Sequence, residues 1–425
     1  MDQPDLLTDL TRILPLLVAV TSLIVAILSL IFAIIGYKRS SDAKRVHSFQ
    51  LAIKIIKNNY TKLAEKSLEI YREIYTDQFD KEQMIINHLI YRKDWTINEN
   101  QRAIPITEVE LISSGNVIER SGTHQKETEV GFDSYKITPY PFYSLVENLL
   151  IFSNGVNIWD HPTYAIRNIS IQKNEDSWIP RLDVYKCSYY DFFNSCMCFE
   201  FVMADTLSKG KKVNDRPMEF KRKYSLEEFS NRDCGIGIVT LTLFKNVITK
   251  KSVKNYLVLH TRSKDVIEGS NIINAVPAGT FQPSTSGTEI EPIILNIVRE
   301  FSEELLGKIE FTYEHDIGEV RSSPIGKILE RGTYFLGMGF NPVNSYLELM
   351  TITVIDLNDK QSRKIFGRTV FDLEERLSEN FEGTYELQTL SKKKLLNLSK
   401  TYRAAPSLKE ICSLLYDNFD NLPFL

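Results

Sequence analysis

Residues Ala275 to Gly307 read AVPAGTFQPSTSGTEIEPIILNIVREFSEELLG, and the second half of this stretch carries one arginine and four glutamates in a fixed order. The order is R-E-apolar-x-E-E, with one further glutamate eight residues before the arginine. From average composition, a chance occurrence in a chain of this length has a probability of roughly one in a thousand or less. The five residues are Glu291, Arg299, Glu300, Glu303 and Glu304.

The pattern predicts a helix that begins near Pro292 and ends near Gly307. Proline suits a first helical turn because its missing N–H is not needed there. Glycine can end a helix in a left-handed turn. Apolar residues recur at steps of three and four, so that one face of the helix is apolar. They are Ile294, Ile297, Val298, Phe301 and Leu305.

On such a helix Glu300, Glu303 and Glu304 share one side of about one turn. Carboxylates that close repel each other unless a cation lies among them, and Mg²⁺ is a hard cation that takes oxygen ligands of this kind. The alternative is a solvated acidic face with Arg299 as an ordinary ion-pair partner. Spacing alone leaves both interpretations open.

The stretch resembles the Nudix box, G-x5-E-x7-R-E-U-x-E-E-x-G-U with U aliphatic. Its charged positions match Glu291 and Arg299 to Glu304, and Val276-Pro277-Ala278-Gly279 resembles the loop that opens the box. The resemblance implies metal ligands at Glu300, Glu303 and Glu304 with Mg²⁺ as the cation. It also implies nucleotide contacts at Gly279 and Arg299, and Arg262, at the end of a predicted strand, is placed to reach a phosphate.

The box departs from the family pattern in two places. Counting back from Glu291, Thr285 stands at the glycine position, so about six residues are inserted if Gly279 is the family glycine. At the far end, Leu306 and Gly307 stand where the family has a glycine and an aliphatic residue. The altered loop favours a nucleotide sensor over a hydrolase, and whether the chain is an enzyme stays open. In Nudix enzymes a further glutamate outside the box often serves as the catalytic base or as a metal ligand. The candidates here are Glu310, Glu314, Glu319 and Glu348.

The predicted fold class is an α+β Nudix-like α/β/α sandwich over residues 232–425, preceded by a single N-terminal transmembrane helix and a helical stalk. The alternation of apolar residues predicts strands, and three-to-four spacing predicts helices. The expected strands are Gly235–Lys245, Asn255–Arg262, Gly332–Asn341 and Ser345–Asp356, and the expected later helices are Phe371–Leu377 and Leu390–Tyr402.

Residues Ile13 to Tyr37 contain no charge, and 25 uncharged, mostly apolar residues are long enough to span a bilayer. Lys38, Arg39, Lys44 and Arg45 follow directly, so the positive-inside rule predicts a cytoplasmic C-terminal part and an N-terminus outside the bacterial inner membrane. Small residues recur in the span at steps of three and four, which lets membrane helices approach closely and predicts a homo-oligomer. A lone anchor is the alternative. These small residues are Ala19, Ser22, Ala26, Ser29, Ala33 and Gly36.

The chain has 425 residues and a net charge of −4, which predicts no general affinity for a DNA or RNA duplex. We expect a short extracytoplasmic N-terminus (1–12), a transmembrane helix (13–37), a helical stalk and linker (38–110), an aromatic-rich segment that packs on the Nudix-like domain (111–231), and that domain (232–425). Three roles stay open for the basic loop at 208–223. It is a solvated surface turn, it contacts anionic lipid headgroups, or it helps to hold a polyanionic ligand.

A membrane span joined to a Nudix-like domain resembles the membrane-anchored Nudix effectors of bacterial CBASS anti-phage systems. That resemblance implies an effector whose domain senses a cyclic oligonucleotide second messenger and whose spans then cluster to disrupt the inner membrane. The alternative is a membrane-tethered, Mg²⁺-dependent Nudix hydrolase of a nucleoside diphosphate derivative. The effector would leave the bound nucleotide intact, whereas the hydrolase would convert it.

Overall fold

The structure is a computed structural model, and it describes most of the chain from residue 50 onward. The described ranges are 50–75, 84–97, 103–113, 162–174, 177–208, 233–263, 271–283, 290–307, 321–377 and 383–422, with the single residues 47, 226, 229 and 424. Ala52 to Leu425 group into one compact unit, and all that follows concerns this unit.

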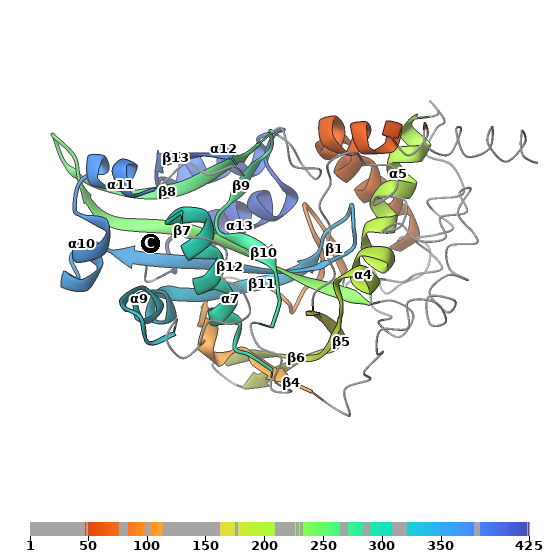
Figure 1. The fold of residues 1–425 in the computed structure, drawn as a ribbon, viewed down its shortest axis with the longest axis horizontal. Coiled ribbons are helices and arrows are strands. Elements are labelled where there is room, and N and C mark those ends of the chain that lie inside the picture. The colour runs from red at the N-terminus through yellow and green to blue at the C-terminus, as the bar shows by residue number, and fades with distance from the viewer. Residues whose placement is uncertain are drawn as a thin grey trace, which may run out of the picture. The chain divides into compact units, whose positions relative to one another are not determined.

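The centre of the fold is a group of long strands that are buried on both faces (Figure 1). β7 (Cys234–Ile248) and β8 (Val253–Arg262) form an antiparallel hairpin, β12 (Leu347–Asp356) lies parallel to β7, and β11 (Thr333–Phe340) lies antiparallel to β12. β7 is almost continuously apolar and buried, which is typical of a strand that is covered on both faces.

Shorter strands extend this centre, and the described strands together form a 13-stranded sheet. Ile90 in β2 pairs with Phe340 in β11, and Ala165 in β5 pairs with Gly235 in β7. The added strands are β1 (Met84–Ile86), β2 (Ile90–Arg92), β3 (Ile104–Pro105), β4 (Glu110–Ile112), β5 (Pro162–Asn174), β6 (Ser177–Ser188), β9 (Ile273–Ala275), β10 (Ala278–Thr280) and β13 (Gly383–Thr389).

Helices cover both faces of the central strands. In Figure 1, α7 and α9 lie in front of β7 and β12, and α13 lies behind them. Phe366 in α10 meets both Phe244 of β7 and Phe301 of the segment after α7 edge-on, so these elements share one apolar layer. The labelled helices are α4 (Tyr189–Phe192), α5 (Cys198–Ser208), α7 (Ile293–Glu300), α9 (Pro324–Gly332), α10 (Lys360–Phe366), α11 (Val370–Arg376), α12 (Lys392–Lys400) and α13 (Pro406–Asp417), with the π-helical turns η2 (Phe193–Met197) and η4 (Phe301–Leu305) and the 3₁₀ turn η1 (Ile106–Glu108).

The predicted fold class is wrong. The described residues form a mixed α/β fold around one large sheet, to which segments before residue 232 contribute six strands, β1 to β6. Within these residues no helix has both the length and the apolar character needed to cross a bilayer. The predicted span at 13–37, with its small residues from Ala19 to Gly36, lies outside the described residues.

The predicted stalk is also wrong. Residues 51–75 do form a helix, but one side of it is buried in the domain, with Ile56 and Leu63 fully inaccessible. The Tyr71 hydroxyl lies 2.9 Å from the Ser345 Oγ, and the Asn341 amide donates to the Tyr60 hydroxyl. The apolar side of this helix therefore packs on the folded domain instead of extending from it as a stalk.

The predictions of individual elements after residue 232 are confirmed. The two strands before the box form the β7–β8 hairpin, and the two after it form β11 and β12. The later helices are α11 and α12. Each has strong local signals, and α11 begins with a complete capping box between Thr369 and Asp372.

Threonines form a buried polar layer beneath the helices on the α7 side of the sheet. Five of them are at most 1 % exposed: Thr240, Thr242, Thr333, Thr351 and Thr353. The hydroxyls of Thr240 and Thr351 lie 2.7 Å apart, and that of Thr351 also reaches the Val239 carbonyl at 3.3 Å. The hydroxyls thus satisfy one another inside an otherwise apolar core.

We expect Thr351→Val to lower the free energy of unfolding by about 1–3 kcal/mol, because it leaves the Thr240 hydroxyl buried without its partner. Thr240→Val costs less, because the Thr351 hydroxyl keeps the Val239 carbonyl as its acceptor. The double variant is more stable than the sum of the two losses predicts, since both partners are then apolar. Urea unfolding of the four proteins measures this, and strictly additive losses would contradict it.

A buried carboxylate joins the C-terminal helix α13 to the turn between β1 and β2. Glu410 is 1 % exposed and accepts four hydrogen bonds at 2.9–3.3 Å. The donors are the Asn87 side-chain amide, the backbone N–H groups of His88 and Leu89, and the Tyr91 hydroxyl. Burial raises the pKa of Glu410, while these four donors favour its ionised form.

Candidate functional site

The helix that carries the box residues is positioned by its apolar face. It begins after Pro292 and continues as α7 and η4 to Leu305. Ile294, Ile297, Val298, Phe301 and Leu305 are each at most 2 % exposed, as their spacing predicts. Gly307 has a positive φ of 61°, which is the predicted left-handed end of the helix. The prediction of this helix is confirmed.

The last turn of this helix is π-helical rather than α-helical, over Phe301–Leu305. A π turn carries an extra residue and changes which side chains lie above one another. The angular spacing assumed for Glu300, Glu303 and Glu304 was that of a regular α-helix. Their arrangement therefore has to be taken from the contacts that each side chain makes.

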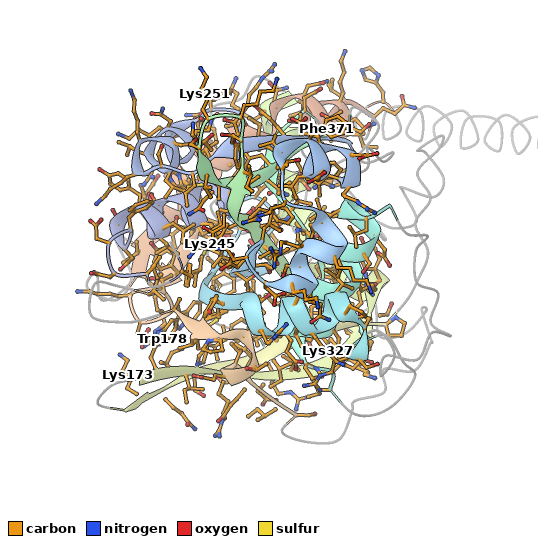
Figure 2. The ribbon with its side chains drawn as sticks, turned by 90° about the vertical axis from the view of Figure 1, so that its left-hand side faces the viewer. Lys173, Trp178, Lys245, Lys251, Lys327 and Phe371 are labelled. Carbon is orange, nitrogen blue, oxygen red and sulfur yellow. The ribbon has the colours of Figure 1, made fainter. Side chains whose placement is uncertain are left out.

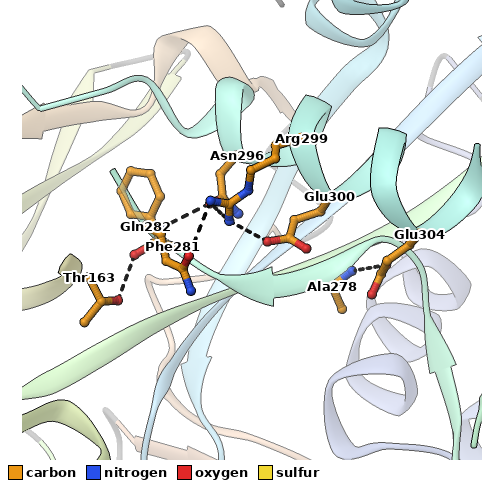
Figure 3. Close-up of polar contacts among 8 residues, drawn as sticks. All are labelled: Thr163, Ala278, Phe281, Gln282, Asn296, Arg299, Glu300 and Glu304. Atoms are coloured by element: carbon orange, nitrogen blue, oxygen red, sulfur yellow. Dashed lines mark hydrogen bonds and ion pairs between the residues drawn. The ribbon is translucent and has the colours of Figure 1, made fainter. Parts of the chain in front are cut away.

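Arg299 is held in a network of polar side chains (Figure 3). Its Nη2 donates to Glu300 Oε1 at 2.6 Å and to Asn296 Oδ1 at 2.8 Å, and its Nη1 donates to Gln282 Oε1 at 3.4 Å. The Gln282 backbone N–H also donates to Asn296 Oδ1. The Arg299 and Glu300 side chains are only 14 % and 15 % exposed, so the ion pair is partly shielded from water and is held in place on three sides.

The β10 strand lies directly against the carboxylates of the helix. The Ala278 backbone N–H donates to Glu304 Oε2 at 2.9 Å (Figure 3). A Cβ placed on Gly279 would lie 2.3 Å from Glu300 Oε1, so any larger residue there would force the Glu300 carboxylate to move. The loop glycine and the box helix therefore meet in space, despite the residues inserted between them in the sequence.

The predicted metal ligands do not fit a three-carboxylate magnesium site. Glu300 is paired with Arg299, Glu304 accepts the Ala278 N–H, and Glu303 is half-buried. In the part of the chain that the structure describes, no group of three or more His, Cys, Asp or Glu side chains is arranged to hold a metal ion. The Glu300 and Glu304 carboxylates instead accept hydrogen bonds from the protein.

His260 and Tyr385 lie beneath the end of the box helix. Their rings stack with centroids 4.9 Å apart, and the Tyr385 hydroxyl donates to the Glu304 carbonyl. His260 is 4 % exposed, and burial, with a smaller effect of Arg262, lowers its pKa to about 4. It is therefore neutral at physiological pH. No local sequence pattern links His260 to Glu304.

The other candidate residues are placed as follows. Arg262 ends β8, two residues beyond His260, and is half-buried. Glu348 is paired in register with Gly237, which is paired with Thr280, so it points to the face opposite Gly279 and the box helix. It accepts a hydrogen bond from Asn341. Glu310, Glu314, Glu319 and the basic loop at 209–223 lie outside the described residues.

Sequence reasoning missed Gln282 and Asn296, which fix Arg299. Asn296 lies three residues before Arg299 on the same helix, and this spacing is the one signal that could have found it. Gln282 follows β10 in a segment without periodicity. Its position becomes apparent only when β10 pairs with β7 and brings it to the helix.

No protein-family model matches this chain, and no curated protein resembles it in sequence.

Proposed function

We propose that this domain binds a nucleotide at the face where β10 meets α7 and η4. The observation that carries the proposal is the contact between the Ala278–Gly279 loop and the carboxylates of Glu300 and Glu304. The loop that resembles the opening of the Nudix box lies against the box helix, although it is about six residues longer than the family pattern.

The geometry favours a sensor over a hydrolase. Glu300 and Glu304 are already engaged by Arg299 and by the Ala278 N–H, and they do not converge on a metal position. A rigid face of this kind suits binding, because little ordering is needed when a ligand arrives. We propose a cyclic oligonucleotide as the ligand, with the chain acting as the effector of a bacterial anti-phage system. The membrane part of that role depends on residues 13–37, outside the described ranges.

The test is isothermal titration of the full-length chain in detergent with a panel of cyclic di- and trinucleotides and of linear nucleoside diphosphate derivatives, with and without Mg²⁺. The same mixtures are then separated by anion exchange. We expect one cyclic nucleotide to bind and to be recovered whole. If a linear nucleotide is converted, and the conversion is lost in Glu303→Gln and Glu304→Gln, the chain is a hydrolase instead. If no nucleotide binds, both functions are excluded.

We expect Gly279→Ala to weaken binding of that nucleotide at least tenfold, because the new methyl group would displace Glu300 from its pair with Arg299. Gly237→Ala is the matched control: it lies on the neighbouring strand, and its Cβ would meet the nearest side chain at an ordinary 3.4 Å. Titration of both variants, with thermal unfolding to confirm that they fold, measures the difference. Equal affinities for the two variants would remove the β10 contact from the binding face.

A further inference from the structure

Lys186 lies on the β5–β6 hairpin, which the sequence did not connect with the box. It is paired in register with Tyr164 across the hairpin, and its Nζ is 5.9 Å from the centroid of the Tyr164 ring. The Tyr164 hydroxyl accepts the backbone N–H of Glu291 at 3.2 Å, and Glu291 acts electrostatically on Lys186. Lys186 and Tyr164 therefore lie beside Glu291, the first glutamate in the charge order of the box.

The hairpin is joined directly to the segment that holds Arg299. The Tyr164 ring packs on Phe281 with centroids 4.5 Å apart, and the Tyr164 N–H donates to the Phe281 carbonyl at 3.0 Å. The Thr163 hydroxyl donates to the same carbonyl, also at 3.0 Å (Figure 3). The next residue, Gln282, accepts from Arg299. A continuous series of contacts thus leads from Lys186 to the Arg299 network.

A nucleotide bound beside the box needs a further positive charge near its phosphates, and Lys186 can supply it. The box brings several carboxylates together, and the guanidinium of Arg299 is already paired with Glu300. A nucleotide adds further negative charge, and the carboxylates do not converge on a metal that would offset it. Lys186 is half-buried, and burial lowers its pKa while Glu291 opposes the shift. A partly desolvated ammonium group interacts more strongly with an anion than a fully solvated one does.

We propose that Lys186 contacts the phosphate groups of the bound nucleotide and that the binding face extends onto the β5–β6 hairpin. This rests on the proposed function, and it adds a residue and an element to that site. The ligand class is an anion with phosphodiester or diphosphate oxygens. The Tyr164 ring positions the Lys186 ammonium group. The Tyr164 hydroxyl positions Glu291 by accepting a hydrogen bond from its backbone N–H.

The test uses the full-length chain, with inorganic diphosphate and the cyclic nucleotide that binds best as probes. We expect Lys186→Gln to weaken the binding of both probes about tenfold or more, and Lys186→Arg to keep most of the affinity. Lys173→Gln is the matched control, since Lys173 lies near the other end of the same hairpin and is exposed (Figure 2). It carries the same change in charge and should leave both affinities unchanged.

The pH profile separates a ligand contact from a structural ion pair. If the ammonium of Lys186 binds the phosphate, affinity falls as the pH rises through its lowered pKa. Lys186→Arg moves this alkaline loss to higher pH, because a guanidinium stays charged. Lys186→Gln with unchanged affinity and lower thermal stability would assign the lysine to the fold and overturn the inference. Failure of the wild-type chain to bind either probe would instead overturn the proposed function.

Discussion

Replacing Glu410 with alanine is expected to lower the free energy of unfolding by about 3–5 kcal/mol, because four donors, two buried and two part-buried, lose their acceptor at once. The backbone N–H groups of His88 and Leu89 have no freedom to turn toward another partner. Their hydrogen bonds to Glu410 hold the turn between β1 and β2 against α13. Losing these bonds therefore also destabilises the edge of the sheet that β1 and β2 form.

Glu410→Gln separates the hydrogen bonds from the charge. Its amide oxygen can keep the two backbone donors, while the Tyr91 hydroxyl and the Asn87 side chain can each reorient to accept from the amide NH₂. We expect it to recover more than half of the stability lost in Glu410→Ala. Glu375→Ala, at an exposed position of α11, is the control and should change stability by less than about 0.5 kcal/mol. Urea unfolding measures all three, and equal losses for alanine and glutamine would mean that the charge itself is what stabilises the turn.

The second large effect is a loss of stability in mild acid. Burial lowers the pKa of both His88 and His260 to about 4, with Lys409 and Arg72 adding to the effect at His88 and Arg262 at His260. In the unfolded chain both titrate near 6.5. Between pH 6.5 and 4 the unfolded chain therefore binds protons that the folded chain does not. The free energy of unfolding falls over this window by up to about 3 kcal/mol for each histidine.

The raised pKa of Glu410 acts in the opposite direction, so the histidine contribution is best measured as a difference. In His260→Leu the loss between pH 6.5 and 4 should be smaller than in the wild type by up to about 3 kcal/mol, whatever the variant's stability at neutral pH. Urea unfolding at several pH values gives the two curves. Parallel curves would mean that His260 is as easily protonated in the folded chain as in the unfolded one.

The parts of the fold that were predictable carry their signals locally. The β7–β8 hairpin has two apolar runs joined by a polar turn, and α7 has an apolar face with a proline before it and a glycine after it. The pairing of β2 and β3 with β11 has no such signal. These strands are only two or three residues long, and their partner lies more than 200 residues away in the chain. A periodic pattern shows which face of a strand is buried but does not identify the strand beside it.

The candidate site was predictable to a similar degree. The charge order singled out Arg299 and Glu300, and the resemblance implied a nucleotide contact at Gly279, which in the fold lies beside Glu300. The π turn after Glu300 was not predictable, because one extra residue in a turn leaves the apolar spacing almost unchanged. Lys186 has no sequence signal at all. It reaches the box only because the β5–β6 hairpin joins β7 through two residue pairs.

The pairing of Ile90 with Phe340 also has a consequence for synthesis on the ribosome. The two residues are 250 positions apart (340 − 90), and at about 5–20 residues per second the later strand is made roughly 12–50 s after the earlier one. During that interval β2 and β3 have no partner in β11, and the 51–75 helix has no Ser345 or Asn341 to dock against. The nascent chain therefore exposes unpaired strands to aggregation until β11 has been made, whatever the stability of the finished fold. We expect a chaperone to bind the chain during this period.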